Sequence, residues 1–191
     1  RTRGSEQDGR VLDEAGFLEE LRAARREPRR VVVVAEPGMG KTTWLRHVIW
    51  LLAGADTEPP LHGEQLLPVM LTCEEWSGLL KSTPSATDQT LQETLAKHFF
   101  TRLGSNAPTA QDWGRWIAGS DVLFCLDDLE RLPRDGSSAL REALAYRLGK
   151  CPVILAGRIE ALFTHSHLLP ETPVWSLAPL QFKQQTRLVH S

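Results

Sequence analysis

One segment, residues 31–50, constrains the fold of this chain more than any other, and it reads VVVVAEPGMGKTTWLRHVIW. Its four consecutive valines are β-branched and apolar, which predicts a strand buried on both faces. A glycine-rich turn follows, and apolar residues then recur at helical spacing through Trp44, Leu45, Val48 and Ile49. Because a buried strand that enters a helix through a tight turn is a building unit of α/β folds, we expect a sheet covered by helices.

The turn itself, residues 35–42, fits the phosphate-binding pattern [A/G]-x-x-x-x-G-K-[S/T]. Gly38 and Gly40 permit backbone angles that a side chain resists, and such a turn points successive N–H groups at phosphate oxygens. The helix N-terminus and the Lys41 ammonium add positive charge, and the Thr42 hydroxyl can coordinate Mg²⁺. We therefore expect a Mg-nucleotide to be bound by these residues: Glu36, Pro37, Gly38, Met39, Gly40, Lys41, Thr42 and Thr43.

Short apolar runs alternate with segments of helical periodicity along the rest of the chain. We expect strands at residues 31–34, 66–73, 122–126, 153–156 and 174–177, and helices at residues 42–53, 88–103, 111–118 and 137–148. Such alternation is typical of a parallel sheet with helices on both faces. The predicted fold class is α/β with three layers, in which helices flank a central, mostly parallel sheet of about five strands.

The 191 residues allow one sizeable core rather than two ordinary domains. Residues 30–178 contain the phosphate loop and all the expected strands, so we assign them to this core. Residues 1–29 are interpreted as a helical lead-in, because apolar residues have roughly helical spacing between residues 11 and 24. A new helix is expected to begin at Pro179, so residues 179–191 are interpreted as the start of a truncated small helical domain.

The third expected strand runs directly into two acids, in the sequence VLFCLDD of residues 122–128. Ligands of parallel sheets bind at the carboxyl ends of the strands. Asp127 is therefore the expected carboxylate partner of Thr42 in holding Mg²⁺. Either Asp128 or Glu130 would then orient an attacking water, and spacing alone does not choose between them.

The fourth expected strand ends in Gly157 and Arg158. An arginine at this edge can reach the γ-phosphate of a nucleotide and report its presence. The alternative is that Arg158 only forms an ion pair at the surface. With Asp128 and Glu130, it completes the set of expected catalytic residues.

Composition restricts the partners of the chain. Its net charge is −2 and its pI is about 6.3, so nucleic acid is not indicated. No window approaches the ~18 apolar residues of a membrane span, and the N-terminus lacks the apolar core of a secretion signal. Cys73, Cys125 and Cys151 lie far apart in or beside expected strands. This spacing predicts reduced, buried thiols in a cytoplasmic protein rather than a metal site.

Together, these motifs resemble the NACHT domain of the STAND class of signal-transduction P-loop NTPases. The loop AEPGMGKTTWL looks like that family's G-E-x-G-x-G-K-[S/T]-[S/T]-[L/W], and similar matches are LLPVML, VLFCLDDLERL, PVILAGR and WSLAPLQFKQQ. The resemblance covers residues 31–185. NACHT domains commonly read D-G-x-D-E at the acidic strand. Here Asp128 replaces the glycine, Glu130 the second aspartate and Arg131 the glutamate, and the D-D pair looks like the NB-ARC relatives.

The resemblance implies a P-loop NTPase fold and a switch that holds ATP or ADP with Mg²⁺ and hydrolyses ATP slowly. It further implies self-association of the ATP-bound full-length protein, with effector and sensor domains outside this chain, in innate immunity or antiphage defence. ATP is expected over GTP because the guanine-reading pattern N-K-x-D is absent from the sequence. Two other functions stay open: a nucleotide-binding scaffold with little or no turnover, and a small-molecule kinase whose lid would use Arg131, Arg134, Arg141 and Arg147.

Overall fold

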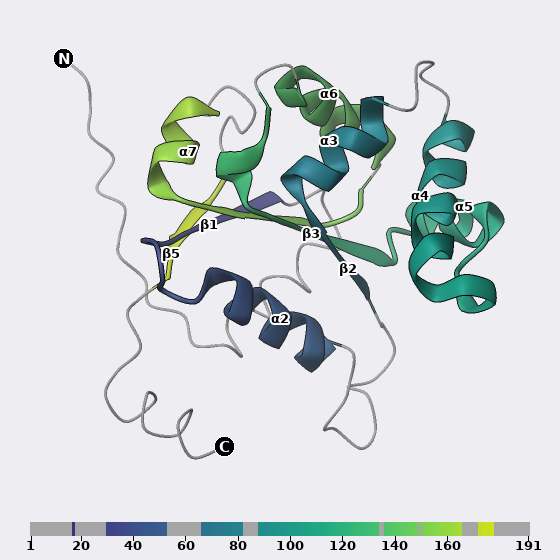
Figure 1. The fold of residues 1–191 in the computed structure, drawn as a ribbon, viewed down its shortest axis with the longest axis horizontal. Coiled ribbons are helices and arrows are strands. Elements are labelled where there is room, and N and C mark those ends of the chain that lie inside the picture. The colour runs from purple at the N-terminus through teal and green to yellow at the C-terminus, as the bar shows by residue number, and fades with distance from the viewer. Residues whose placement is uncertain are drawn as a thin grey trace.

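The structure is a computed structural model that describes Phe17 and residues 30–52, 66–81, 88–133, 136–148, 150–165 and 172–177. Figure 1 shows a central sheet with helices on both of its faces. Apart from Phe17, the predicted lead-in at residues 1–29 lies outside the described residues, and so does the segment 179–191. The division of the chain into these parts therefore stays a prediction.

Five strands form the sheet: β1 (Arg30–Val34), β2 (Leu67–Thr72), β3 (Val122–Asp127), β4 (Val153–Gly157) and β5 (Val174–Ser176). All neighbouring strands are parallel, in the order β2-β3-β4-β1-β5. The expected α/β fold with a sheet of about five strands is confirmed. Because the strands are parallel, their carboxyl ends share one edge of the sheet. Strand β4 lies between β1 and β3, so its end separates the phosphate loop from the acidic strand end.

The helices bury their apolar sides on two separate cores, one on each face of the sheet. On one face, α2 (Lys41–Leu52) buries Leu45 and Val48, and the Phe17 ring joins this core, 4.7 Å from the Trp44 ring between centroids. The other core lies under five helices: α3 (Cys73–Lys81), α4 (Asp88–Leu103), α5 (Ala110–Gly119), α6 (Gly136–Glu142) and α7 (Ile159–Thr164). The result is the three-layer arrangement of Figure 1, which strands that are apolar on both sides require.

Helix α3 was not expected from the sequence, because Cys73 extends the apolar run of β2. In the structure, β2 ends at Thr72 and a capping box begins the helix. The Thr72 hydroxyl accepts from the Glu75 N–H at 3.1 Å, and a Glu75 carboxylate oxygen accepts from the Thr72 N–H at 2.8 Å. Burial opposes ionisation of Glu75, but this bond and the Arg102 side chain outweigh it, and the pKa of Glu75 is lowered. The T-x-x-E spacing was the signal for this helix.

Helix α7 was also missed. It has six residues and begins after Arg158, whose side chain makes no capping hydrogen bond, so no start signal marks it. The helix expected at residues 137–148 begins as α6 and continues as a π-helical turn, η4 (Ala143–Arg147). Short 3-10 turns follow α4 and β3: η2 (Gly104–Asn106) and η3 (Leu129–Arg131).

Candidate functional site

The expected phosphate loop joins β1 to α2 at the carboxyl edge of the sheet. Its first amide, that of Ala35, donates to the Gly157 carbonyl at 3.2 Å, which ties the loop to the end of β4. Gly38 and Gly40 have φ values of +80° and +81°. Glycine takes these angles without a steric cost, whereas a side chain would be strained even though open space surrounds both positions. The loop therefore has the backbone that the sequence pattern requires.

The other residues expected at the nucleotide lie around this turn. Glu36, Pro37 and Thr43 are exposed, and Met39 is half-buried. Helix α2 begins at Lys41 and is 12 residues long, so its N-terminal amides and positive dipole end lie at the loop.

Thr42 and Asp127 meet at the start of α2. The Thr42 hydroxyl donates to one carboxylate oxygen of Asp127 at 2.6 Å, and the other oxygen accepts from the Asp128 N–H at 2.9 Å. Asp127 is the last residue of β3 and only 2% exposed. A buried carboxylate is costly unless it is hydrogen-bonded, and these two bonds meet that need. The two residues expected to bind Mg²⁺ are thus in contact.

Glu130 lies between the two cationic side chains of the site. Its Oε1 is 4.0 Å from the Lys41 ammonium and 3.1 Å from Arg158 Nε. Its Oε2 accepts from the Arg158 backbone N–H at 3.1 Å. One carboxylate therefore connects the phosphate loop with the end of β4.

The second candidate acid, Asp128, has different surroundings. Its backbone is left-handed, with φ of +58°, and its carboxylate is 3.6 Å from Nε of Arg131. The Arg131 side chain is 65% exposed, so this ion pair is open to solvent. Of the two acids that the sequence left open, Glu130 is the one in contact with Lys41 and Arg158.

The electrostatic effect of these acids is visible at Cys73, the first residue of α3. Burial raises the pKa of its thiol, and the charges of Asp127, Asp128 and Glu130 raise it further. All three cysteines are buried and free, as expected. The same acids that surround Cys73 would concentrate negative charge where a divalent cation is expected.

Gly157 is a residue whose role the sequence analysis missed. A Cβ added there would lie 2.6 Å from the Leu129 Cβ and 3.2 Å from Glu130 Oε2. The absent side chain therefore lets η3 approach the end of β4. A glycine inside a strand pattern often marks such a close approach, so the sequence LAGR carried the signal.

These residues fit a Mg-nucleotide. Magnesium prefers oxygen ligands and usually takes one or two carboxylates together with substrate phosphates. Asp127 and Thr42 offer such oxygens, whereas no group of three or more His, Cys, Asp or Glu side chains in the described part of the chain could hold a metal alone. The left-handed glycines and the α2 N-terminus provide the amide cradle for phosphates.

Comparison with solved structures identifies the fold. The ORC2 protein of Aeropyrum pernix, solved in complexes with ADPNP and ADP, superimposes with a TM-score of 0.52 at 11% sequence identity, over 97% of this chain and 53% of that chain. This chain has the three-layer α/β fold of P-loop NTPases. No family model matches the sequence, and no curated protein matches it.

Two further structures are similar at lower TM-scores. A DNA replication initiation factor has a TM-score of 0.46 at 11% identity, over 94% of this chain and 51% of its own. PCH-2 of C. elegans has a TM-score of 0.46 at 14% identity, over 86% of this chain and 42% of its own. The chain thus spans about half the length of the solved structures that it matches.

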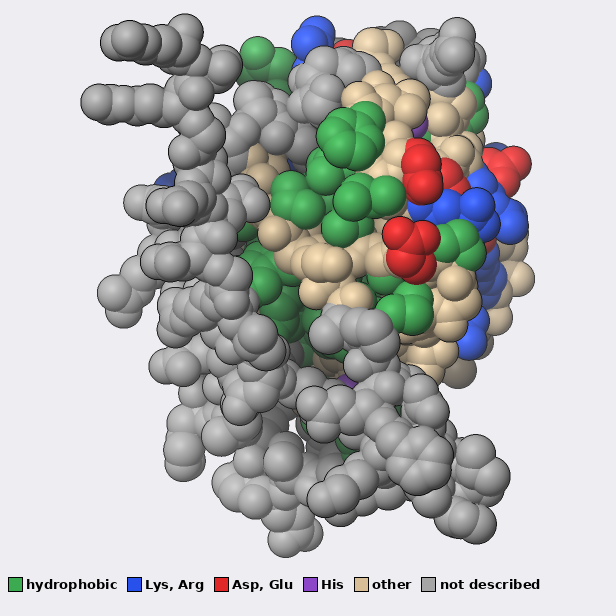
Figure 2. Space-filling model, turned by 90° about the vertical axis from the view of Figure 1, so that its left-hand side faces the viewer, with side chains coloured by type: hydrophobic (Ala, Val, Ile, Leu, Met, Phe, Trp, Pro, Cys, Tyr) green, Lys and Arg blue, Asp and Glu red, His purple; other side chains and the backbone are tan. Residues whose placement is uncertain are grey.

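The face that carries α7 adjoins the site. Figure 2 views the molecule from this side and shows hydrophobic side chains gathered beside acidic and basic ones. Ile159 and Phe163, one helical turn apart on α7, are 43% and 74% exposed. Because α7 begins directly after Arg158, this apolar face is continuous in the chain with the end of β4.

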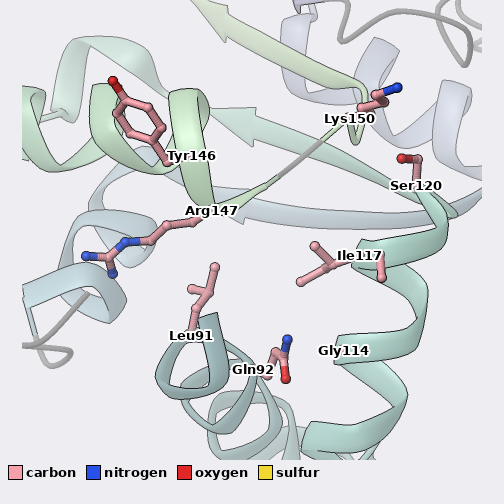
Figure 3. A pocket seen from close by; sticks show the side chains of 9 residues that line it. Leu91, Gln92, Gly114, Ile117, Ser120, Tyr146, Arg147 and Lys150 are labelled. Carbon is pink, nitrogen blue, oxygen red and sulfur yellow. The ribbon is translucent and has the colours of Figure 1, made fainter. Parts of the chain in front are cut away.

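A cavity of about 310 Å³ lies away from the phosphate loop, between α4, α5 and the π-helical turn η4. Ser120 and Lys150, which line it, precede β3 and β4, so it lies toward the amino edge of the sheet. Figure 3 shows the Arg147 guanidinium and the Lys150 ammonium pointing away from each other, so they do not converge on a common ligand.

None of the described helices has the length and apolar composition that a bilayer crossing needs.

Proposed function

We propose that this chain binds a Mg-nucleotide at the loop of residues 35–42 and hydrolyses its terminal phosphate slowly. The main support for this proposal is one arrangement of residues at one edge of the sheet. This edge carries the left-handed glycines, Lys41, the Thr42–Asp127 pair and Arg158. Backbone amides of residues 36–43 would hold the phosphates, and Thr42 and Asp127 would hold Mg²⁺. The bound metal would neutralise phosphate charge during transfer.

Lys41, Glu130 and Arg158 are proposed to act at the terminal phosphate. Lys41 and Arg158 are cations that can stabilise its charge. Glu130 is the stronger candidate to orient water, because it is 4.0 Å from Lys41, whereas Asp128 pairs with the exposed Arg131. Asp128 is kept as the second candidate.

A nucleotide-binding scaffold with little turnover is the second function that an observation favours. Both carboxylate oxygens of Glu130 are already engaged by Arg158 and Lys41. A carboxylate whose oxygens are both occupied in this way must first be released before it can orient a water, so water activation would be slow. The kinase alternative has less support, because Arg131 and Arg147 make local ion pairs with Asp128 and Glu142.

Among nucleotide-binding and nucleotide-hydrolysing proteins, the motif resemblance supports a NACHT-type switch of the STAND group. The γ-phosphate and its Mg²⁺ would bias one of two arrangements of the site, and the ATP-bound full-length protein would self-associate. Effector and sensor domains are proposed to lie outside this chain, and a role in innate or antiphage defence rests on the resemblance alone. The adenine base is preferred because N-K-x-D is absent.

Calorimetric titration of the 191-residue chain with ATP, ADP and GTP in the presence of Mg²⁺ tests the proposal. We expect adenine nucleotides to bind and Lys41→Ala to lose most of this binding. Lys150→Ala is the matched control, because it removes the same charge near the amino edge of the sheet and should bind like the wild type.

Phosphate release then separates the two functions. Turnover that is lost in Glu130→Gln supports the ATPase, whereas binding without detectable release supports the scaffold. If the wild type binds no nucleotide, or if Lys41→Ala binds as well as the wild type, neither function stands.

A further inference from the structure

Glu130 makes contacts that a phosphate would make. Its carboxylate meets the Lys41 ammonium at 4.0 Å and Arg158 Nε at 3.1 Å, and it accepts a backbone N–H at 3.1 Å. Cations and backbone amides are the groups that proteins use to bind phosphate oxygens. The two cations are also those expected at the outer phosphates of a nucleotide.

We propose that Glu130 is an internal counter-anion that competes with the terminal phosphate of a nucleoside triphosphate for Lys41 and Arg158. The inference rests on the proposed nucleotide site and concerns its choice between triphosphate and diphosphate. A bound triphosphate must take over these cations from Glu130, and the cost of separating them lowers its affinity.

The competition acts mainly on the third phosphate. The loop amides and the α2 N-terminus, which do not contact Glu130, are available to a diphosphate and a triphosphate alike. Arg158 does not belong to the loop but follows β4, and its guanidinium forms an ion pair with Glu130. A diphosphate that does not reach Arg158 leaves that pair intact and competes only with the longer Lys41–Glu130 pair, at 4.0 Å. Glu130 therefore favours the diphosphate over the triphosphate.

The exchange requires side-chain motion rather than movement of the backbone. Leu129 is fully buried next to Gly157, which fixes η3 against β4. The side chains of Glu130 and Arg158 are 23% and 50% exposed, so both have space to rotate. After displacement, the freed Glu130 carboxylate stays at the site, where it can contact water. This would connect triphosphate binding to the release of the candidate base.

The test measures dissociation constants for ADPNP, a triphosphate analogue with an imido bridge, and for ADP with Mg²⁺. Glu130→Gln keeps the size of the side chain and removes its charge. We expect it to bind ADPNP about 3- to 10-fold more tightly than the wild type, since the competing ion pairs are partly exposed and individually weak. ADP affinity should change by less than about twofold.

Glu160→Gln is the matched control, because it removes the same charge from an exposed position of α7 two residues beyond Arg158. It should leave the ADPNP/ADP ratio unchanged. In an Arg158→Ala background, Glu130→Gln should have a smaller effect on ADPNP, because one of the contested cations is gone.

Three results overturn the inference while the nucleotide site stands: equal ADPNP affinity in Glu130→Gln and wild type, weaker binding by Glu130→Gln, or the same gain in Glu160→Gln. Weaker binding would show that Glu130 holds Arg158 in place for phosphate. If the wild type, Glu130→Gln and Lys41→Ala all bind no nucleotide, both the site and the inference are overturned. If Glu130→Gln binds ADPNP more tightly than the wild type and Lys41→Ala abolishes ADPNP binding, the site and the inference are both supported.

Discussion

Replacing Gly157 with alanine tests whether close packing between β4 and η3 builds the site. The added Cβ would lie 2.6 Å from the Cβ of Leu129, almost 1 Å short of ordinary contact. Leu129 is fully buried and cannot move into solvent, and the clashing atom is adjacent to its backbone. Because η3 must shift as a unit, Gly157→Ala should overpack the core.

Overpacking of this kind costs about 1–3 kcal/mol, and the buried position of Leu129 places the expected loss at about 2–3 kcal/mol. For a domain of this size, that loss corresponds to a decrease in Tm of roughly 5–10 °C. Thermal unfolding followed by circular dichroism measures it. Gly78→Ala is the matched control, since Gly78 is exposed on α3 and an added Cβ would meet nothing within 4 Å. It should raise stability by about 0.4–1 kcal/mol.

The two alanines therefore have effects of opposite sign although the chemical change is the same. If Gly157→Ala unfolds at the wild-type temperature or above it, η3 moves without cost. The view that a side-chain-free position brings Glu130 against Arg158 would then be wrong.

Three other substitutions or conditions test the remaining parts of the structure. Asp127→Asn should abolish the difference in nucleotide affinity between Mg²⁺ and EDTA, a loss of about tenfold or more in the Mg²⁺-dependent binding measured by calorimetry. Asp128→Gly should raise the free energy of unfolding by about 1 kcal/mol, whereas Asp128→Ala, which keeps the Cβ, should not, because the left-handed backbone penalises a Cβ; urea unfolding distinguishes them. Burial raises the pKa of Cys125 to about 12 and that of Cys151 to about 11 from 9.0. As the pH rises, these thiols therefore ionise in the unfolded chain before they ionise in the folded protein. The free energy of unfolding should keep its full value below about pH 9 and fall above it, by up to about 1.4 kcal/mol per pH unit for each thiol. Urea midpoints measured from about pH 8 to about pH 10.5 test this.

The strands and most helices could be predicted because their signals are local. Apolar runs such as residues 122–126 and 153–156 are short and β-branched or bulky, and they are buried on both faces as expected. The strand order was not predictable in this way, because residues 30–34 and 153–157 pair across more than a hundred residues. Helix α7 has too few residues and no cap, so its sequence carried little information.

The positions of the candidate site residues that belong to one motif could also be predicted from the sequence. Lys41 and Thr42 follow from the loop pattern, and Asp127 follows from its place at a strand end. The contact of Glu130 with both Lys41 and Arg158 was not predictable, because it needs three segments brought together by the order β3-β4-β1. Sequence spacing therefore left Asp128 and Glu130 equivalent as candidates.

The backbone of η3 explains which acid faces the site. Asp128 has φ of +58°, a conformation that suits glycine. Successive residues of a 3-10 turn point about 120° apart. Leu129 is fully buried, so Glu130 is directed to Lys41 and Arg158, and Arg131 is left 65% exposed. An acid moved by one position along η3 would therefore lose the two cations. The buried leucine, rather than the distance of an acid from Asp127 along the chain, determines the residue that meets them.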